Sequence, residues 1–566
     1  MIRFFSKCFA TALIATAFGF AVNAQTNVKE DLPKGWHLKD RAKDGYYGIS
    51  LDRAYDLLKN KKSKTVVVAI IDSGIDTTHE DLRPVLWKNP KEIPGNGIDD
   101  DKNGYVDDIH GWNFIGGKDG RNVKEDSYEA TRVYHRYKAK FQNISDPSTL
   151  SSKDKELYTM WKKAEQQVVG TDKPGTLDLF ILRKTYSAAA NSDSILQKAM
   201  NKEKFSGNEL QAFTPTTDEV RKAKNAFLNF FLMNNSMDMT NQEFMEGFKE
   251  YLSGEERKAE ASVNAPKDYR GEIVKDNEAD INDRFYGNND IMANTPFHGT
   301  HVAGIIAAAR NNDKGINGIA DNVKIMMIRA VPDGDEHDKD IALAIRYAVN
   351  NGAKVINMSF GKGFSPEKHW VDDAVKYAEG KGVLLVHAAG NDANDIDTSW
   401  NFPTPVFMGT DQRASNWITV GASGDPKTGG LVASFSNYGK KEVDVFAPGV
   451  KIYSSIPGGN TYGNAQGTSM ASPVVAGVAA LLLEYFPTLT PHQIKYIIEK
   501  SAVPITSKAK TPGSDKAILL ADMSKTGGIV NAYEAIKLAQ TFTAKTPKAQ
   551  PVKIKPATPA KKLKAV

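Results

Sequence analysis

The sequence predicts an α/β fold with a doubly wound, mostly parallel sheet and helices on both faces. Two observations predict it. Short apolar runs rich in β-branched residues recur along the chain, as strands buried in a parallel sheet do. Segments with helical periodicity separate these runs, and such alternation is typical of a sheet covered by helices. The expected strands are 65–71, 323–328, 353–359, 382–388, 417–421 and 443–446, and the expected helices between them include 340–349 and 371–379.

Composition sets broad limits on what the chain can be. Of its 566 residues, 41% are hydrophobic and 25% are charged, which is the balance of an ordinary globular protein. The length suits one large domain with additions, or two or three domains. A net charge of +5 is too small over this length to indicate a nucleic-acid partner. We therefore expect a globular protein that does not bind nucleic acid.

Residues 1–24 have the pattern of a secretory signal peptide. Two basic residues precede an uncharged, mostly apolar run at 9–22, which is too short to span a bilayer comfortably, and the expected cut follows Ala24. The alternative is an uncleaved membrane anchor. The single cysteine, Cys8, lies in this segment, so the mature chain would contain no disulfide. We expect a secreted or periplasmic protein with no transmembrane segment after signal removal.

Residues 25–64 form a polar N-terminal segment with one helical patch at 51–58. The strand at 65–71 follows and ends in Asp72. An acidic side chain at the carboxyl end of a buried parallel strand lies where open α/β sheets build their functional sites. The alternative interpretation is a structural aspartate that caps the next turn.

A run of alternating acidic residues at 97–108 predicts a calcium-binding loop. Oxygen ligands at alternate positions followed by a glycine match the first half of an EF-hand loop, although the twelfth position is His110 rather than glutamate. The alternative is a turn rich in Asp and Asn without metal. The predicted Ca²⁺ ligands are Asp99, Asp101, Asn103, the backbone carbonyl of Tyr105, and either Asp107 or Asp108.

Two further segments differ from the rest in composition. Residues 120–261 are dense in charge, with Met, Phe and Leu at helical spacing, so we expect a mainly helical insertion in which the aromatic residues form a core. Residues 541–566 are rich in Lys, Pro and Ala and should be disordered. That tail is a solvated spacer, or it could contact acidic envelope polymers.

Histidine and serine each precede a tightly packed helical pattern in the C-terminal half. His298 comes just before a run of small and apolar residues, and Ser469 lies between a glycine and Pro473, which suits a first helical turn. A hydroxyl at a helix N-terminus faces free N–H groups that favour negative charge. With Asp72, these two residues make a Ser-His-Asp triad possible. Asn391, which ends an apolar strand, is the candidate donor to an oxyanion.

The segments that carry these residues resemble the subtilisin family of serine peptidases. The resemblance covers about 65–120 and 268–505, and its four motifs occur in the family's chain order. It implies a catalytic domain of residues 65–119 and 262–540 that cuts protein or peptide substrates through an acyl-enzyme intermediate. The matching motifs are 72–74 (DSG), 298–304 (HGTHVAG), 388–391 (AAGN) and 467–473 (GTSMASP).

The resemblance also implies binding residues. Ser359, Phe360 and Gly361 match the edge segment that pairs with the substrate backbone as an added strand. Together with Ala388, Ala389 and Gly390 they would form the walls of the pocket for the residue before the cut. Asp81 matches an aspartate that binds a structural calcium, with partner ligands expected from the loop 311–319.

Two other functions remain open at the level of sequence. The first is a catalytically silent envelope binding module on the same fold, although such modules usually lose a triad residue or the asparagine, and none is lost here. The second is a peptide acyl-transferase or cyclase. Only the products of the reaction distinguish that second function from a hydrolase.

Overall fold

The structure is a computed structural model of the chain, and it describes residues 32–170, 176–234, 237, 239–294, 296–428 and 430–544. The predicted signal peptide at 1–24 and nearly all of the predicted tail at 541–566 lie outside the described residues.

A nine-stranded sheet forms the centre of the fold, in the order β10-β13-β7-β6-β5-β4-β1-β3-β2. Its strands pair in parallel except for β10, which runs antiparallel to β13, and the predicted fold class is confirmed. The first strand, β1, is apolar on both faces and lies between β3 and β4. The strands are β1 (Val66–Asp72), β2 (Gly111–Asn113), β3 (Val323–Arg329), β4 (Val355–Met358), β5 (Leu384–Ala388), β6 (Trp417–Ser423), β7 (Val445–Pro448), β10 (Val503–Pro504) and β13 (Gly528–Ile529).

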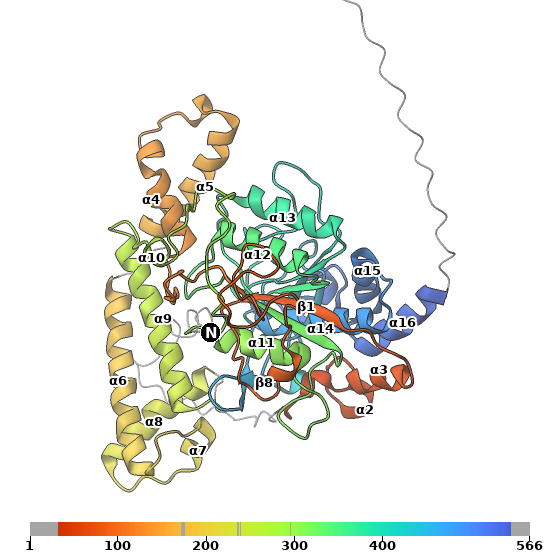
Figure 1. Cartoon of the computed structure of the whole chain (residues 1–566). Helices are drawn as coiled ribbons and strands as arrows, with labels where there is room; N and C mark the ends of the chain where they lie inside the picture. Colours follow the sequence, from red (N-terminus) through yellow and green to blue (C-terminus); the bar gives the residue numbers. More distant parts are fainter. Residues whose placement is uncertain are drawn as a thin grey trace, which may run out of the picture.

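Helices cover both faces of this sheet (Figure 1), and a separate hydrophobic core lies between the sheet and the helices on each face. On one face pack α3 (Leu51–Leu58), α11 (Phe297–Ala307), α14 (Thr468–Tyr485), α15 (Pro491–Ser501) and α16 (Ala532–Ala544). On the other face pack α12 (Asp338–Asn350) and α13 (Lys368–Gly380).

The central helix α14 is apolar around its whole circumference. In the part of the chain that the structure describes, it is the one helix long and apolar enough to cross a membrane by length and composition. However, 89% of that stretch is buried inside the fold, as expected for a helix that is hydrophobic all round and lies in a core.

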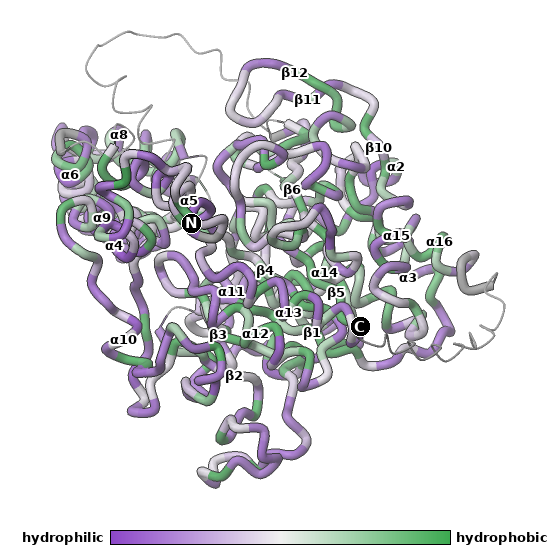
Figure 2. Tube along the Cα trace, turned by 90° about the horizontal axis from the view of Figure 1, so that it is seen from above, coloured by the Kyte–Doolittle hydropathy of each residue, from purple (hydrophilic) through white to green (hydrophobic). Residues whose placement is uncertain are grey.

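The described part of the segment between β2 and α11 is mainly helical between residues 129 and 261. Its two hydrophobic clusters are separate: one joins α4 and α5, and the other joins α6 to α9. These helices stand together at one side of the sheet, as both views show (Figures 1 and 2). They are α4 (Glu129–Phe141), α5 (Ser152–Val169), α6 (Thr176–Met200), α7 (Gly207–Ala212), α8 (Asp218–Met233) and α9 (Asn241–Ala261).

Shorter elements complete the described fold. They are α2 (Arg41–Asp44), α10 (Tyr269–Ile273), the antiparallel pair β8 (Ile452–Ile456) and β9 (Thr461–Ala465), the antiparallel pair β11 (Lys508–Lys510) and β12 (Ala517–Leu519), and five 3-10 turns.

The N-terminal segment packs against the sheet-covering helices rather than standing apart. Trp36 is fully buried, and its indole N–H lies 3.1 Å from the carbonyl oxygen of Val450. The next residue, His37, is also fully buried, and neither ring nitrogen has a hydrogen-bond partner among the described residues. Burial, and then the nearby His301, lower the pKa of His37 from 6.5 to about 3.

This burial predicts an acid-sensitive fold. Because the unfolded chain takes up a proton on His37 below about pH 6.5 and the folded chain does so only near pH 3, stability should fall as pH drops through that window. At pH 4.5 the loss from this group is about 2–3 kcal/mol. In a Ser469→Ala background, which lacks the serine of the expected triad, His37→Phe should lose less stability than the parent between pH 7 and pH 4.5. Denaturant unfolding at both pH values measures the loss, and equal losses in the two proteins would contradict the assignment.

Candidate active site

Asp72 and His298 meet at the carboxyl edge of the sheet. Asp72 ends the central strand β1 and is 2% exposed, whereas the His298 side chain, in the first turn of α11, is 30% exposed. Nδ1 of the imidazole lies 2.7 Å from Oδ1 of the carboxylate, and because a carboxylate only accepts, the ring donates this bond. The backbone N–H of Ser73 donates to the same oxygen at 2.7 Å. The bond to Nδ1 leaves Nε2 of the ring as the acceptor nitrogen.

Ser469 is the second residue of α14. The preceding Gly467 has φ +152°, a left-handed conformation that glycine adopts readily, and the chain turns there from loop to helix. The Ser469 hydroxyl donates to the carbonyl oxygen of Ser359 at 3.2 Å. No hydrogen bond joins this hydroxyl to His298 among the described residues, which is common for catalytic groups in the absence of substrate.

Pro473 lies one turn later than the sequence indicated. It is the sixth residue of α14 and so belongs to the second turn. Because proline has no N–H, the carbonyl of Ser469 lacks its usual helical donor, and the Ser359 hydroxyl donates to that carbonyl instead, at 3.0 Å. Asn357 connects the two segments, since it donates to Ser359 Oγ at 2.9 Å and accepts from Ser472 Oγ at 2.8 Å. The end of β4 is thereby fixed to the start of α14.

Asn391 follows β5 and lies beside the start of α14. Its side-chain oxygen accepts from the backbone N–H of Thr468 at 2.9 Å and from the Thr468 hydroxyl at 3.0 Å. This pairing orients the amide, so that Nδ2 remains as the donor. A Cβ placed on Gly467 would lie 3.5 Å from that nitrogen. The asparagine amide therefore lies beside the loop that carries Ser469.

Hydrogen bonds from neighbouring residues hold the backbone of the two predicted substrate walls, 359–361 and 388–390. Phe360 is buried, and its carbonyl oxygen lies 2.9 Å from Nε2 of His387; burial lowers the pKa of this histidine to about 4. On the other wall, the side-chain amide of Asn437 donates to Ala389 O at 2.9 Å, and the backbone N–H of Asn437 donates to Gly390 O at 2.8 Å. The neighbouring Ser359 and Ala388 are also buried.

A family model described as the subtilase family matches residues 63–521, which is most of the chain. The chain belongs to the subtilase family. Its match to that family takes in both stretches on which the sequence resemblance rests, together with the helical segment between them.

Individual subtilases match over part of the length. A thermophilic serine proteinase from Bacillus sp. (strain AK1) is 47% identical over 33% of this chain and 42% of that protein. Subtilisin DY from Bacillus licheniformis is 40% identical over 36% of this chain and 70% of that protein. An extracellular protease from Xanthomonas campestris pv. campestris is 36% identical over 45% of this chain and 44% of that protein. The chain thus spans less than half the length of two of these three relatives.

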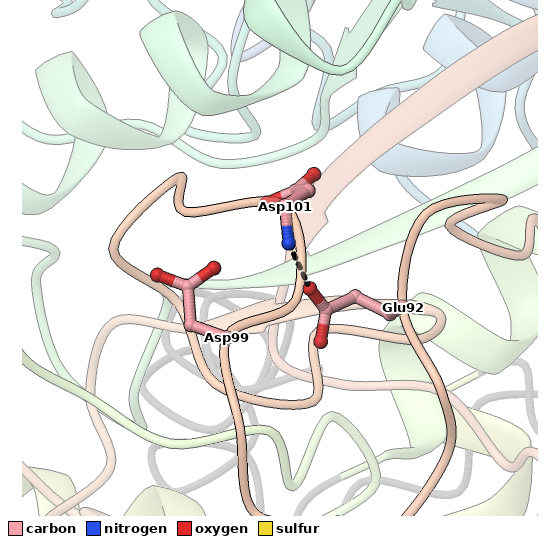
Figure 3. Close-up of side chains that lie close together, drawn as sticks. All are labelled: Glu92, Asp99 and Asp101. Carbon is pink, nitrogen blue, oxygen red and sulfur yellow. Dashed lines mark hydrogen bonds between the residues drawn. The ribbon is translucent and has the colours of Figure 1, made fainter.

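The acidic loop of this subtilase brings together three carboxylates. One oxygen each of Glu92, Asp99 and Asp101 lies within 4.8 Å of the others (Figure 3). Glu92 also accepts from the backbone N–H of Asp101 at 3.1 Å. Asp99 accepts from the backbone N–H groups of Asn103 and Gly104 at 3.0 and 2.7 Å. The sequence did not indicate Glu92, because it precedes the loop and no repeating spacing connects it to the other two.

The two aspartates expected to close the loop lie outside this cluster. Asp107 accepts from the backbone N–H groups of Gly95 and Gly97 at 2.8 and 2.9 Å. Asp108 is fully buried and accepts from the Tyr347 hydroxyl at 2.5 Å. Burial raises the pKa of Asp108 to about 6. Both side chains thus stabilise the loop from outside the cluster. The other two expected ligands, Asn103 and Tyr105, are joined by a bond from the Tyr105 N–H to Asn103 Oδ1 at 2.8 Å.

Asp81 is fully buried at a second place. Its two carboxylate oxygens accept from the side-chain amide of Asn312 at 2.6 Å and from the Tyr462 hydroxyl at 2.8 Å. The loop 311–319, expected to supply partner ligands, does therefore contact Asp81. Among the described residues, no cluster of three acidic or histidine ligands includes Asp81.

Proposed function

We propose that this subtilase is a secreted or periplasmic serine endopeptidase that hydrolyses peptide bonds through Asp72, His298 and Ser469. The observation that carries the proposal is the 2.7 Å bond between the buried carboxylate of Asp72 and the partly exposed ring of His298, together with the place of Ser469 as the second residue of the core helix α14. Support for secretion comes from the signal-like residues 1–24 and from the relative described as extracellular.

In the proposed mechanism Ser469 attacks the carbonyl carbon of the scissile bond. His298 Nε2 accepts the serine proton and then gives it to the leaving amine, which yields the acyl-enzyme. Water, deprotonated by the same nitrogen, then releases the acid product. Asp72 keeps the proton on Nδ1 and stabilises the imidazolium that forms in each step. For the first step the Ser469 hydroxyl has to exchange its bond to Ser359 for one to His298.

The tetrahedral intermediate places a negative oxygen near Asn391 and the start of α14. The Nδ2 group of Asn391 can donate to that oxygen, because its own carbonyl oxygen is held by Thr468. The first N–H groups of a helix lack intrahelical partners and favour negative charge. Together these donors form an oxyanion hole of the kind that stabilises acyl-transfer intermediates.

Replacement of the nucleophile tests the proposal directly. Ser469→Ala should abolish labelling by a fluorophosphonate probe and reduce peptide cleavage by several orders of magnitude, because the covalent step is removed. Ser415→Ala, which removes an exposed hydroxyl bonded to Glu379, is the matched control and should still be labelled. Labelling of Ser469→Ala would refute the assignment. Mass spectrometry of the products distinguishes the functions, since transferred or cyclic peptides would indicate an acyl-transferase.

Removal of the side-chain donor tests the oxyanion role. Asn391→Ala should lower kcat by about a hundred- to a thousand-fold and leave KM nearly unchanged, because the interaction exists only once the oxyanion forms. Steady-state kinetics on one peptide substrate measure both constants. A large rise in KM with little change in kcat would show that Asn391 instead binds the ground state.

We also propose that Glu92, Asp99 and Asp101 hold a structural Ca²⁺ ion. Their oxygens fit the oxygen-only preference of this ion, and three carboxylates this close repel one another unless a cation neutralises them. Asp81 with the loop 311–319 is a second candidate, supported by the resemblance and by the contact to Asn312.

Calcium should therefore raise the melting temperature, because an ion that binds only the folded state stabilises it by about 2.7 kcal/mol at a hundred times its Kd. In the Ser469→Ala background, melting is measured in chelator and in calcium. Glu92→Gln should reduce the calcium-induced rise. The control Asp119→Asn, which removes an exposed carboxylate outside the cluster, should keep it. An equal rise in both variants would mean that the cluster is not the calcium site.

A further inference from the structure

Gly361 lies at the far end of the predicted substrate edge 359–361, next to a residue that is already paired. Lys362 forms an antiparallel bridge with Phe402, in which its N–H donates to Phe402 O at 2.9 Å and its carbonyl accepts at 2.8 Å. Because neighbouring residues of an extended chain direct their backbone groups to opposite sides, the N–H and carbonyl of Gly361 point away from Phe402, although a Cβ placed on Gly361 would lie 3.1 Å from the Phe402 carbonyl oxygen. Among the described residues no backbone group pairs with Gly361. Its N–H and carbonyl are available to an added strand.

The helical segment between β2 and α11 contacts Lys362, the residue that follows Gly361. The Lys362 ammonium lies 2.7 Å from the carboxylate of Glu129, which is the first residue of α4, and 2.9 Å from that of Asp338. The ammonium also donates to the carbonyl of Glu336 at 2.7 Å. The side chains of Lys362 and Glu129 are 2% and 4% exposed. Buried charges of this kind hold their neighbours in one arrangement, because removing either partner leaves a charge without compensation.

Arg132, within α4, is a second cation that fixes the first turn of this helix. It pairs with Glu129 at 2.7 Å and donates to the carbonyls of Asp335 and Glu336 at 2.9 and 3.2 Å. The backbone N–H of Glu129 donates in turn to the carboxylate of Asp335 at 2.9 Å. Burial favours the neutral acid, but Arg132 and Lys362 hold the pKa of Glu129 well below its usual range. The start of α4 is thus clamped between 335–338 and Lys362.

Two further contacts hold α4 and α5 against the two segments that form the Lys362–Phe402 bridge. Phe364 lies two residues past Lys362 and is buried in the hydrophobic cluster that joins the two helices. On α5, the Lys163 ammonium lies 3.5 Å above the ring of Trp400, two residues before Phe402. The α4–α5 hairpin, residues 129–169, therefore contacts the chain on both sides of the Lys362–Phe402 bridge.

We infer that the α4–α5 hairpin closes the far end of the substrate-binding edge. The Ser469 hydroxyl lies against Ser359, so the reacting carbonyl lies there and the peptide extends along the edge by about 3.3 Å per residue. The first three residues before the cut lie beside 359–361, and the fourth meets Lys362 and Glu129. The hairpin thereby limits backbone pairing to three residues, and residues farther from the cut confer no selectivity. This inference rests on the proposed function.

A series of nested peptides tests the inference. The peptides share one sequence around the cut and carry two, three, four or five residues before it. We expect kcat/KM to rise about fivefold or more from two to three residues, since the third pairs with Gly361, and to change less than about twofold from three to five. A further rise of about fivefold at four or five residues would overturn the inference. An enzyme inert toward the fluorophosphonate probe and all four peptides would instead refute the proposed function.

Variants that loosen the α4–α5 hairpin test whether it causes the limit of three residues before the cut. Glu129→Gln keeps the shape of the clamp and removes its charge, and Lys163→Ala removes only the exposed contact with Trp400. Either variant should raise kcat/KM for the five-residue peptide about threefold or more relative to the three-residue peptide. Arg183→Ala, which breaks an exposed ion pair between α6 and α9, should leave the ratio unchanged. Because Lys163 is on the surface, its variant should fold even if Glu129→Gln does not. An unchanged ratio in a folded, probe-reactive Lys163→Ala protein would overturn the inference.

Discussion

The buried carboxylate of Asp72 is the constraint on which the rest of the site depends. Its Oδ1 receives bonds from Ser73 and His298, whereas Oδ2 is buried without a partner among the described residues. Such a group is costly unless it is hydrogen-bonded or paired with a charge. His298 supplies the bond in the resting state, and it supplies the compensating charge whenever it holds a proton. Because β4 lies next to β1 and β5 lies next to β4, the two walls of the site, 359–361 and 388–390, follow the next two strands of the sheet.

Local patterns predicted the long central elements, but the edges of the sheet could not be predicted in this way. The run at 65–71 is apolar on both faces, so its burial followed from composition alone. The strands β2, β10 and β13 have only two or three residues each, and their pairing depends on what lies beside them rather than on propensity. Pro473 suited a first helical turn by its residue type, yet the Ser359 hydroxyl, from a distant segment, allows it one turn later.

The same limit applies to the charged residues. Asp99 and Asp101 were evident as an alternating run, whereas Glu92 joins them through a turn that no spacing reveals. The insertion was recognisable as helical from its periodicity, but no local pattern indicated that Glu129, the first residue of α4, would pair with Lys362, 233 residues later. Buried ion pairs between distant segments depend on the completed fold, and they are what joins this insertion to the edge that is proposed to bind substrate.

A crystal structure of the protein with a peptidyl phosphonate bound would test the central claim most directly, because the adduct imitates the tetrahedral intermediate. The account predicts phosphorus bonded to Ser469 Oγ, one phosphonyl oxygen within hydrogen-bonding distance of Asn391 Nδ2, and His298 Nε2 turned toward the adduct while Nδ1 keeps its bond to Asp72. An adduct on another residue, or a phosphonyl oxygen directed away from Asn391, would contradict it.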